Sequence, residues 1–168
     1  MFLIVPLTLL FVTDEKKLNT FFYIWGVLAI VVTLKGIMQL KIGVDPWEKA
    51  WLDEGNYKTH ILFGQLRVFS FLSDAGQFGA NQAYSGVVAA IVSMSMKDWK
   101  RKLFFLSVAG LSFYGMIISG TRGAISIPLI GFSAFFVLRK NKTVMISGFF
   151  LLLLVFYFFK FTTIGQLS

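Results

Sequence analysis

Residues 103–138 read LFFLSVAGLSFYGMIISGTRGAISIPLIGFSAFFVL, and Arg122 is the only charged residue among them. The stretch contains two apolar runs, residues 103–120 and 123–138. Each run approaches the length of about 20 residues that a helix needs to cross a bilayer. Because only Thr121 and Arg122 separate the runs, the stretch predicts a helical hairpin that crosses a membrane twice.

The composition of the whole chain supports a membrane protein. Hydrophobic residues make up 57% of the 168 residues and charged residues 14%, against about 45–50% and about 25% in soluble domains. The apolar content excludes disorder, and the absence of cysteine excludes a disulfide scaffold. The formal charge of +8 suggests nucleic-acid binding in a soluble protein, but here it is better explained by orientation in a membrane, so no nucleic-acid partner is expected.

Apolar stretches along the chain predict an all-α, polytopic transmembrane helical bundle with five to six spans. The predicted spans are residues 1–12, 19–40, 78–96, 103–120, 123–138 and 143–161. They form a single membrane domain over residues 1–168. The first stretch is short and the chain stops soon after the last, so we expect a piece of a larger polytopic protein.

Basic residues predict the orientation of the bundle. Nine of the 16 Lys and Arg residues fall in the short connections 13–18, 97–102 and 139–142. Such clusters favour the cytoplasmic side. The longer segment 41–77 and the turn at Thr121 and Arg122 are then expected outside.

The outer segment 41–77 begins with signals for a short helix. Asp45 suits the N-cap and Glu48 completes a capping-box pattern. Trp47 and Trp51 are four residues apart and are expected on one helical face. We interpret the pair as an interfacial anchor at the level of the lipid headgroups, in preference to a direct substrate contact.

Arg67 lies among apolar and aromatic residues, and Asp74 and Gln77 follow it. A guanidinium in such surroundings needs an anionic partner or a wet cavity. One interpretation is an ion pair with Asp74, seven residues away on one helical face. The other is a cationic site for phosphate, which a guanidinium binds with two parallel hydrogen bonds. The sequence leaves both open.

Arg122 is the second candidate for an anion site. Gly120 and Gly123 flank it and allow a tight turn, and a helix is expected to begin near Ala124, with its N–H groups facing the turn. The alternative is an ordinary loop arginine. We prefer the anion site, because a cation in an outer turn opposes the orientation rule.

Other polar residues give weaker signals. His60 is the only histidine and cysteine is absent, so no metal site is expected. We interpret His60 as a polar loop residue and Lys35 as a side chain that extends from its span toward the headgroups. No paired carboxylates and no Ser/His/Asp or Cys/His set are recognisable, and the catalytic residue stays unknown.

Several of these motifs together resemble the O-antigen ligase and O-antigen polymerase family, most closely its Bacteroidetes-type members. The resemblance covers about residues 19–161. It rests on the runs QLKIGVDPWE (39–48), RVFSF (67–71), SDAGQFGA (73–80) and SGTRG (119–123), and on the pairs Trp51-Leu52 and Thr59-His60.

The resemblance implies a GT-C-type glycosyltransferase of the bacterial inner membrane, active in lipopolysaccharide and cell-surface polysaccharide biosynthesis. Such enzymes move a glycan from an undecaprenyl-diphosphate carrier to lipid A-core or another glycan at the periplasmic face. Their catalysis needs no metal or other cofactor. The resemblance also implies that Arg67 and Arg122 bind the diphosphate, with Asp74 and Gln77 beside them. The family's later periplasmic histidine has no counterpart here, so this chain alone is not expected to be a complete enzyme.

Two other functional classes fit the same residues. A membrane transporter or flippase would use the arginines to bind an anionic lipid-linked substrate. A helical assembly segment would have no site. Paired repeats or broken helices, which favour a transporter, are not recognisable in the sequence.

Overall fold

The computed structural model describes residues 14–62 and 64–138, so the predicted spans 1–12 and 143–161 lie outside it. The described part is helical, and its one extended feature is an antiparallel pair of two-residue strands. In chain order the elements are α2 (Glu15–Ile42), α3 (Pro46–Trp51), η1 (Leu52–Asn56), α4 (Tyr57–His60), β1 (Ile61–Leu62), β2 (Gln65–Leu66), α5 (Ala75–Ser95), α6 (Trp99–Ile118), η2 (Arg122–Ile125) and α7 (Ser126–Leu138).

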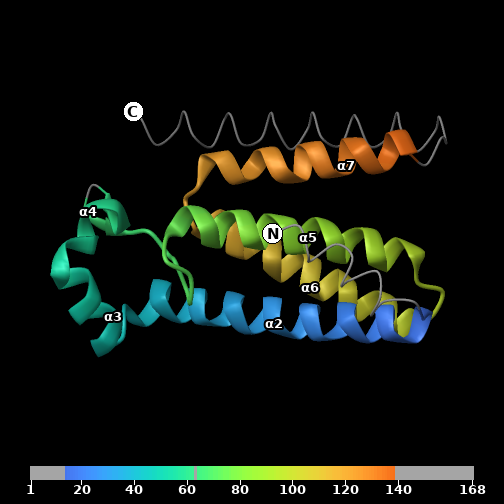
Figure 1. Cartoon of the computed structure of the whole chain (residues 1–168), viewed down its shortest axis with the longest axis horizontal. Helices are drawn as coiled ribbons and strands as arrows, with labels where there is room; N and C mark the ends of the chain where they lie inside the picture. The colour runs from blue at the N-terminus through green and yellow to red at the C-terminus, as the bar shows by residue number, and fades with distance from the viewer. Residues whose placement is uncertain (1–13, 63, 139–168) are drawn as a thin grey trace.

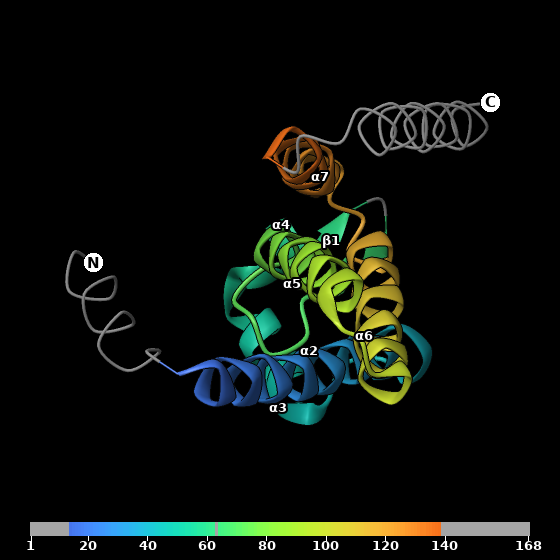
Figure 2. The same cartoon turned by 90° about the vertical axis from the view of Figure 1, so that its right-hand side faces the viewer.

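The four longer helices α2, α5, α6 and α7 lie alongside one another and alternate in direction (Figure 1). Helix α5 is central, because it packs against α6, α2 and α7. Seen from the end, α7 lies over α5 on the side opposite α2 (Figure 2). The predicted hairpin therefore has its tight turn, but α7 packs mainly on α5 rather than on α6.

Two aspartates set helix starts that hydropathy alone misplaces. Asp14 caps α2 by accepting a 3.2 Å hydrogen bond from the N–H of Lys16, so most of the predicted connection 13–18 is the first turn of a helix. Asp98 caps α6 through the N–H of Lys100 in the same way. The prediction of loops there was wrong, because charged residues fit a capped first turn as well as a loop.

Aromatic side chains such as Tyr23 and Phe105 pack between α2 and α6, whereas polar side chains join α2 to α5. Gln82 of α5 accepts a 3.0 Å hydrogen bond from the hydroxyl of Thr33 in α2, and both side chains are fully buried. Trp25 donates its indole N–H to Ser85 at 3.1 Å. Such contacts let helices pack closely without a large apolar side chain between them.

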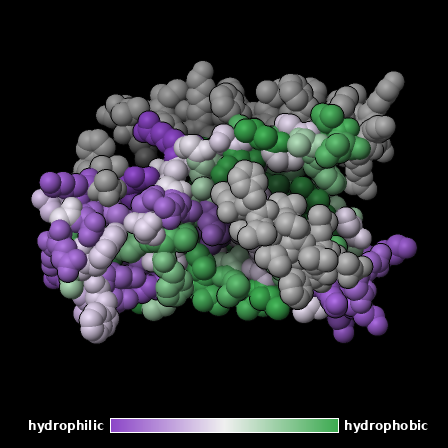
Figure 3. All heavy atoms as spheres, in the orientation of Figure 1, coloured by the Kyte–Doolittle hydropathy of each residue, from purple (hydrophilic) through white to green (hydrophobic). Residues whose placement is uncertain are grey.

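Two of the described helices, α2 and α6, are long and apolar enough to cross a membrane. The outer face of α2 exposes Ile24, Val27, Leu28, Val31, Leu34 and Met38. Figure 3 shows apolar atoms along the middle of the visible face and hydrophilic atoms at its two ends. This distribution is typical of helices whose middle contacts lipid.

Gly36 of α2 leaves no room for a side chain beside Phe78 of α5, and it provides a test of the packing. A Cβ at this position would lie 2.7 Å from Cζ of Phe78 and 3.1 Å from Cγ1 of Val68. We expect Gly36→Ala to lower the free energy of unfolding in detergent micelles by about 1–3 kcal/mol, because the helices must separate.

Gly110 is the matched control, because no atom lies within 4 Å of the Cβ it would gain. Gly110→Ala should leave the free energy of unfolding unchanged or raise it by up to about 1 kcal/mol, as expected for Gly→Ala in a helix. Equal effects of the two substitutions would contradict the packing of α5 on α2.

Candidate functional site

The predicted site residues all lie at one end of the bundle, where α2 and α6 end and α5 begins (Figure 1). Helices α3 and α4 and the connection 67–74 cover this end. The opposite end holds the start of α2 and the connection from α5 to α6. The fold therefore gathers Arg67, Asp74, Gln77 and Arg122 from three separate segments.

Arg67 contacts the turn that carries Arg122. Its Nη2 donates a 3.1 Å hydrogen bond to Oγ1 of Thr121, 54 residues further along the chain. The Thr121 hydroxyl in turn donates to the carbonyl of Ala75 at 2.9 Å. One threonine thus joins the Arg67 segment, the start of α5 and the turn before Arg122. The remaining N–H groups of the half-buried guanidinium keep their capacity to bind an anion.

Asp74 does not pair with Arg67. No ion pair joins them within residues 14–62 and 64–138, and Asp74 instead caps α5 by accepting a 2.9 Å hydrogen bond from the N–H of Gln77. The seven-residue spacing suggested a shared helical face, but α5 begins only at Ala75. The ion-pair interpretation was therefore wrong, because the chain between the two residues is not helical.

Gln77 lies in the first turn of α5, and its side chain is exposed. Its Oε1 accepts a 2.9 Å hydrogen bond from the hydroxyl of Ser73. The amide NH2 group is left to face the surface at the same end as Arg67.

Arg122 follows the turn that Gly120 makes in the left-handed region, at φ +63°. Its side chain is exposed and has no hydrogen bond or ion pair to any residue that the structure describes. The helix start expected near Ala124 is confirmed, because a helical segment runs from Arg122 to Leu138. The N–H of Ala124 bonds to the carbonyl of Thr121 in a short 3-10 turn, and the α-helix begins at Ser126.

The turn reaches α5 because residue 79 is a glycine. A Cβ on Gly79 would lie 3.0 Å from Cβ of Thr121 and would overlap Oγ of Ser119. Ser119 is fully buried, and its Oγ accepts the N–H of Thr121 at 3.2 Å. The absence of a side chain at this position therefore lets Thr121 come within reach of both Ala75 and Arg67.

Lys35 has partners within the described residues, and its predicted extension toward the headgroups stays a prediction. Its ammonium forms ion pairs with Asp45 at 2.8 Å and Glu48 at 3.0 Å. These are the two capping-box residues of α3, and the predicted box is confirmed. The chain reverses at Gly43, whose φ is +98°, and so brings the box back to α2. Sequence reasoning missed the two ion pairs, because Asp45 and Glu48 lie beyond the end of α2 and no helical periodicity relates them to Lys35.

His60 is buried at this end of the bundle, and the half-buried Trp51 packs against it. The His60 ring is buried between Trp51 and Phe69, with ring centroids 5.0 and 4.9 Å away. Its Nδ1 and Nε2 lie 2.8 Å from the carbonyl of Asn56 and 3.0 Å from that of Ser73. His60 is therefore not a solvated loop residue. Trp47 is 86% exposed and Trp51 is half-buried. The two lie four residues apart in α3 and line the same surface hollow, which confirms that they share one helical face.

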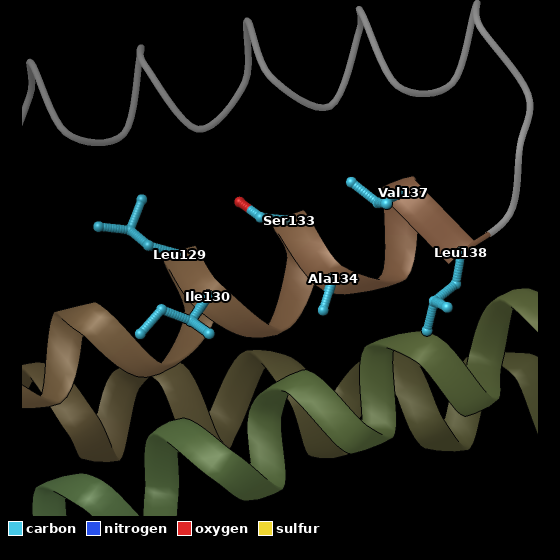
Figure 4. Close-up of a pocket in the computed structure, with 6 residues that line it drawn as sticks. All are labelled: Leu129, Ile130, Ser133, Ala134, Val137 and Leu138. Carbon is cyan, nitrogen blue, oxygen red and sulfur yellow. The ribbon is translucent and has the colours of Figure 1, made fainter.

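The remaining surfaces give little chemistry. An apolar hollow on α7 is lined by Leu129, Ile130, Ser133, Ala134, Val137 and Leu138 (Figure 4). It has no ionisable side chain. Residues 14–62 and 64–138 contain no group of three or more His, Cys, Asp or Glu side chains that could hold a metal ion.

These features define a class: a helical protein with two helices long and apolar enough to cross a membrane, with two arginines at one end of the bundle as a candidate site. Comparisons with protein-family models, with curated proteins and with solved structures found no match. The resemblance therefore rests on the sequence motifs alone, and both the family and the function are proposals.

The ion pair between Lys35 and Asp45 predicts a pH dependence. The hydrogen bond from Lys35, followed by the one from the N–H of Glu48, holds the pKa of the Asp45 carboxyl below its usual value. A lowered pKa in the folded protein contributes stability above the ordinary aspartate pKa. That stability is lost as the pH falls through the lowered value.

Asp45→Asn isolates this effect, because asparagine is an equally good N-cap but has no charge. We expect the variant to melt at a lower temperature than the native chain near neutral pH. The difference should shrink as the pH falls through the lowered pKa of Asp45. Melting followed by circular dichroism across the acidic range tests this. A pH-independent difference would mean that the charge of Asp45 does not contribute.

Proposed function

We propose that this chain is part of an O-antigen ligase or O-antigen polymerase-like glycosyltransferase of the GT-C type. It would move a glycan from undecaprenyl diphosphate to lipid A-core or to another glycan, in cell-surface polysaccharide biosynthesis. The observation that carries the proposal is the 3.1 Å hydrogen bond between Arg67 and Thr121. It unites the two arginine motifs on which the resemblance rests.

The placement of charge supports the proposed topology, a polytopic bundle of five to six spans in the bacterial inner membrane. The end opposite the arginine site carries Lys16, Lys17, Lys97, Lys100, Arg101 and Lys102. By the positive-inside tendency this end faces the cytoplasm. The arginine site, together with segment 41–77 and its short interfacial helix, then faces the periplasm, where glycans are transferred from lipid carriers.

The chemistry of the reaction suits two guanidinium groups. Negative charge develops on the diphosphate leaving group as the glycosidic bond breaks, and preorganised cationic donors stabilise it without a metal ion. Arg67 is held in place by Thr121, and the exposed Arg122 has its donors free of the described residues. Gln77 offers its amide NH2 group to sugar hydroxyls, and Asp74 orients the start of α5.

No residue of the described part is assigned as the catalytic base. The His60 ring is buried, and both of its nitrogens lie against backbone carbonyls. A base must lie within hydrogen-bonding reach of the acceptor hydroxyl. We therefore propose that this chain supplies the diphosphate site and that the base comes from elsewhere in the enzyme.

The proposed orientation can be tested by cysteine labelling, because the chain has no cysteine of its own. Asp53→Cys and Gly123→Cys should react with a membrane-impermeant thiol reagent applied from the periplasmic side. Lys100→Cys should react only after the membrane is opened. All three positions are exposed. Labelling of the Lys100→Cys variant in intact spheroplasts would contradict the orientation.

The arginine site can be tested by binding of undecaprenyl diphosphate to the chain in lipid nanodiscs. We expect Arg67→Gln and Arg122→Gln each to weaken binding by about 10- to 100-fold, because each removes charge-assisted hydrogen bonds of about 1.5–3 kcal/mol. Arg122→Lys should also weaken binding, since lysine loses the planar pair of donors.

Lys49→Gln is the matched control, because Lys49 is an exposed cation at the same end of the bundle. It should bind like the native chain. Native-like binding by both arginine variants would refute the site. In membranes containing the complete enzyme, movement of the lipid between leaflets without glycan transfer would favour a transporter instead.

A further inference from the structure

Gln39 is a buried amide that holds the segment following Arg67. Its side chain is 2% exposed. Its Oε1 accepts the N–H groups of Phe69 at 3.2 Å and Ser70 at 2.7 Å. Its Nε2 donates to the carbonyl of Ser70 at 3.2 Å and to Oε1 of Glu48 at 2.8 Å. Both donors and both acceptor positions of the amide are therefore used.

Ser70 has a backbone conformation that needs such support. Its φ of +56° lies in the left-handed region, which costs free energy for a residue other than glycine. Helix α2 contacts this residue twice, because Gln39 binds its backbone and the carbonyl of Val32 accepts its hydroxyl at 2.7 Å.

One face of α2 therefore receives the chain from Val68 to Ser70. Val32, Gly36 and Gln39 follow one another at helical spacing, i, i+4 and i+7. The two polar contacts lie at the ends of this row. At its centre, Gly36 leaves room for Val68, whose side chain is fully buried.

The backbone that carries Arg67 is fixed on both sides. Val68 follows it immediately, and the N–H of Arg67 itself donates to the carbonyl of His60 at 2.8 Å. The backbone of Arg67 is therefore held in place where its side chain extends to Thr121. Without Gln39, two backbone N–H groups and one carbonyl would lose their partner in a buried place.

We propose that Gln39 is a positioning residue for Arg67: it holds the left-handed turn at Ser70 and thereby sets the guanidinium beside Thr121 for a diphosphate. The inference rests on the proposed function of Arg67 as a diphosphate ligand. Glutamate is a poor replacement, because its carboxylate cannot donate to Ser70 and would place a second negative charge beside Glu48.

A double-mutant cycle tests the proposal with undecaprenyl diphosphate in nanodiscs. We expect Gln39→Leu to weaken binding about tenfold in the native chain and about tenfold in the Arg122→Gln variant. In the Arg67→Gln variant it should cause no further loss, because the residue through which Gln39 acts is gone. Additive losses with Arg67→Gln would overturn the proposal.

Thr33→Val is the matched control for stability. It removes a buried hydrogen bond that joins α2 to Gln82 of α5, and no contact with the Arg67 segment is lost. It should lower the melting temperature and leave diphosphate binding unchanged. Equal losses of binding in the Thr33→Val and Gln39→Leu variants would overturn the proposal. Gln39→Glu provides a second variant of native size, with the same expectation as Gln39→Leu.

Limited trypsin digestion gives a readout that does not depend on the ligand. We expect Gln39→Leu and Gln39→Glu to raise the rate of cleavage after Arg67 several-fold, relative to cleavage after the exposed Lys49. Unchanged cleavage would overturn the positioning role. If Arg67→Gln left diphosphate binding intact while the Gln39 variants were cleaved faster after Arg67, the proposed function would fail. The structural action of Gln39 on this segment would then still stand.

Discussion

The two ion pairs of Lys35 organise the end of the bundle that carries the candidate site. An ammonium group on an apolar helix needs close partners, and it finds them in Asp45 at 2.8 Å and Glu48 at 3.0 Å. Because both carboxylates also close the capping box of α3, the same contact starts α3 and docks it on α2. Gln39, one turn further along α2, extends the network from Glu48 to Ser70. The same two carboxylates, Asp45 and Glu48, therefore both neutralise Lys35 and cap α3.

The arginine site depends on a second constraint, the close approach of the turn after α6 to the start of α5. Gly79 permits this approach, and Thr121 uses it to bind Ala75 and Arg67 together. Two flexible guanidinium side chains thus come from backbones that are held by buried contacts. The proposed binding of a diphosphate would benefit from this arrangement, because less conformational entropy would be lost when the ligand binds.

The candidate site could be predicted from the sequence only in part. Arg67 and Arg122 stood out because each is a lone cation among apolar or small residues. Such a pattern can be recognised from the few residues on either side of the arginine. Asp74 lies at the same end of the bundle as Arg67, but its capping role depends on where α5 begins. The contacts of Lys35, Gln39 and Thr121 were not predicted, because their partners lie 9 to 54 residues away. No periodic pattern encodes such distances.

The sequence by itself determined the helical class, the approximate places of the longer helices that the structure describes, and the capping box of α3, because hydropathy and capping act within a few residues of one another. The tertiary structure decided that α7 lies on α5, that His60 is buried and that Arg67 reaches Thr121. These depend on how helix faces fit, on the space that Gly36 and Gly79 leave open, and on which buried polar group finds a partner. Such conditions are met only when distant segments are brought together.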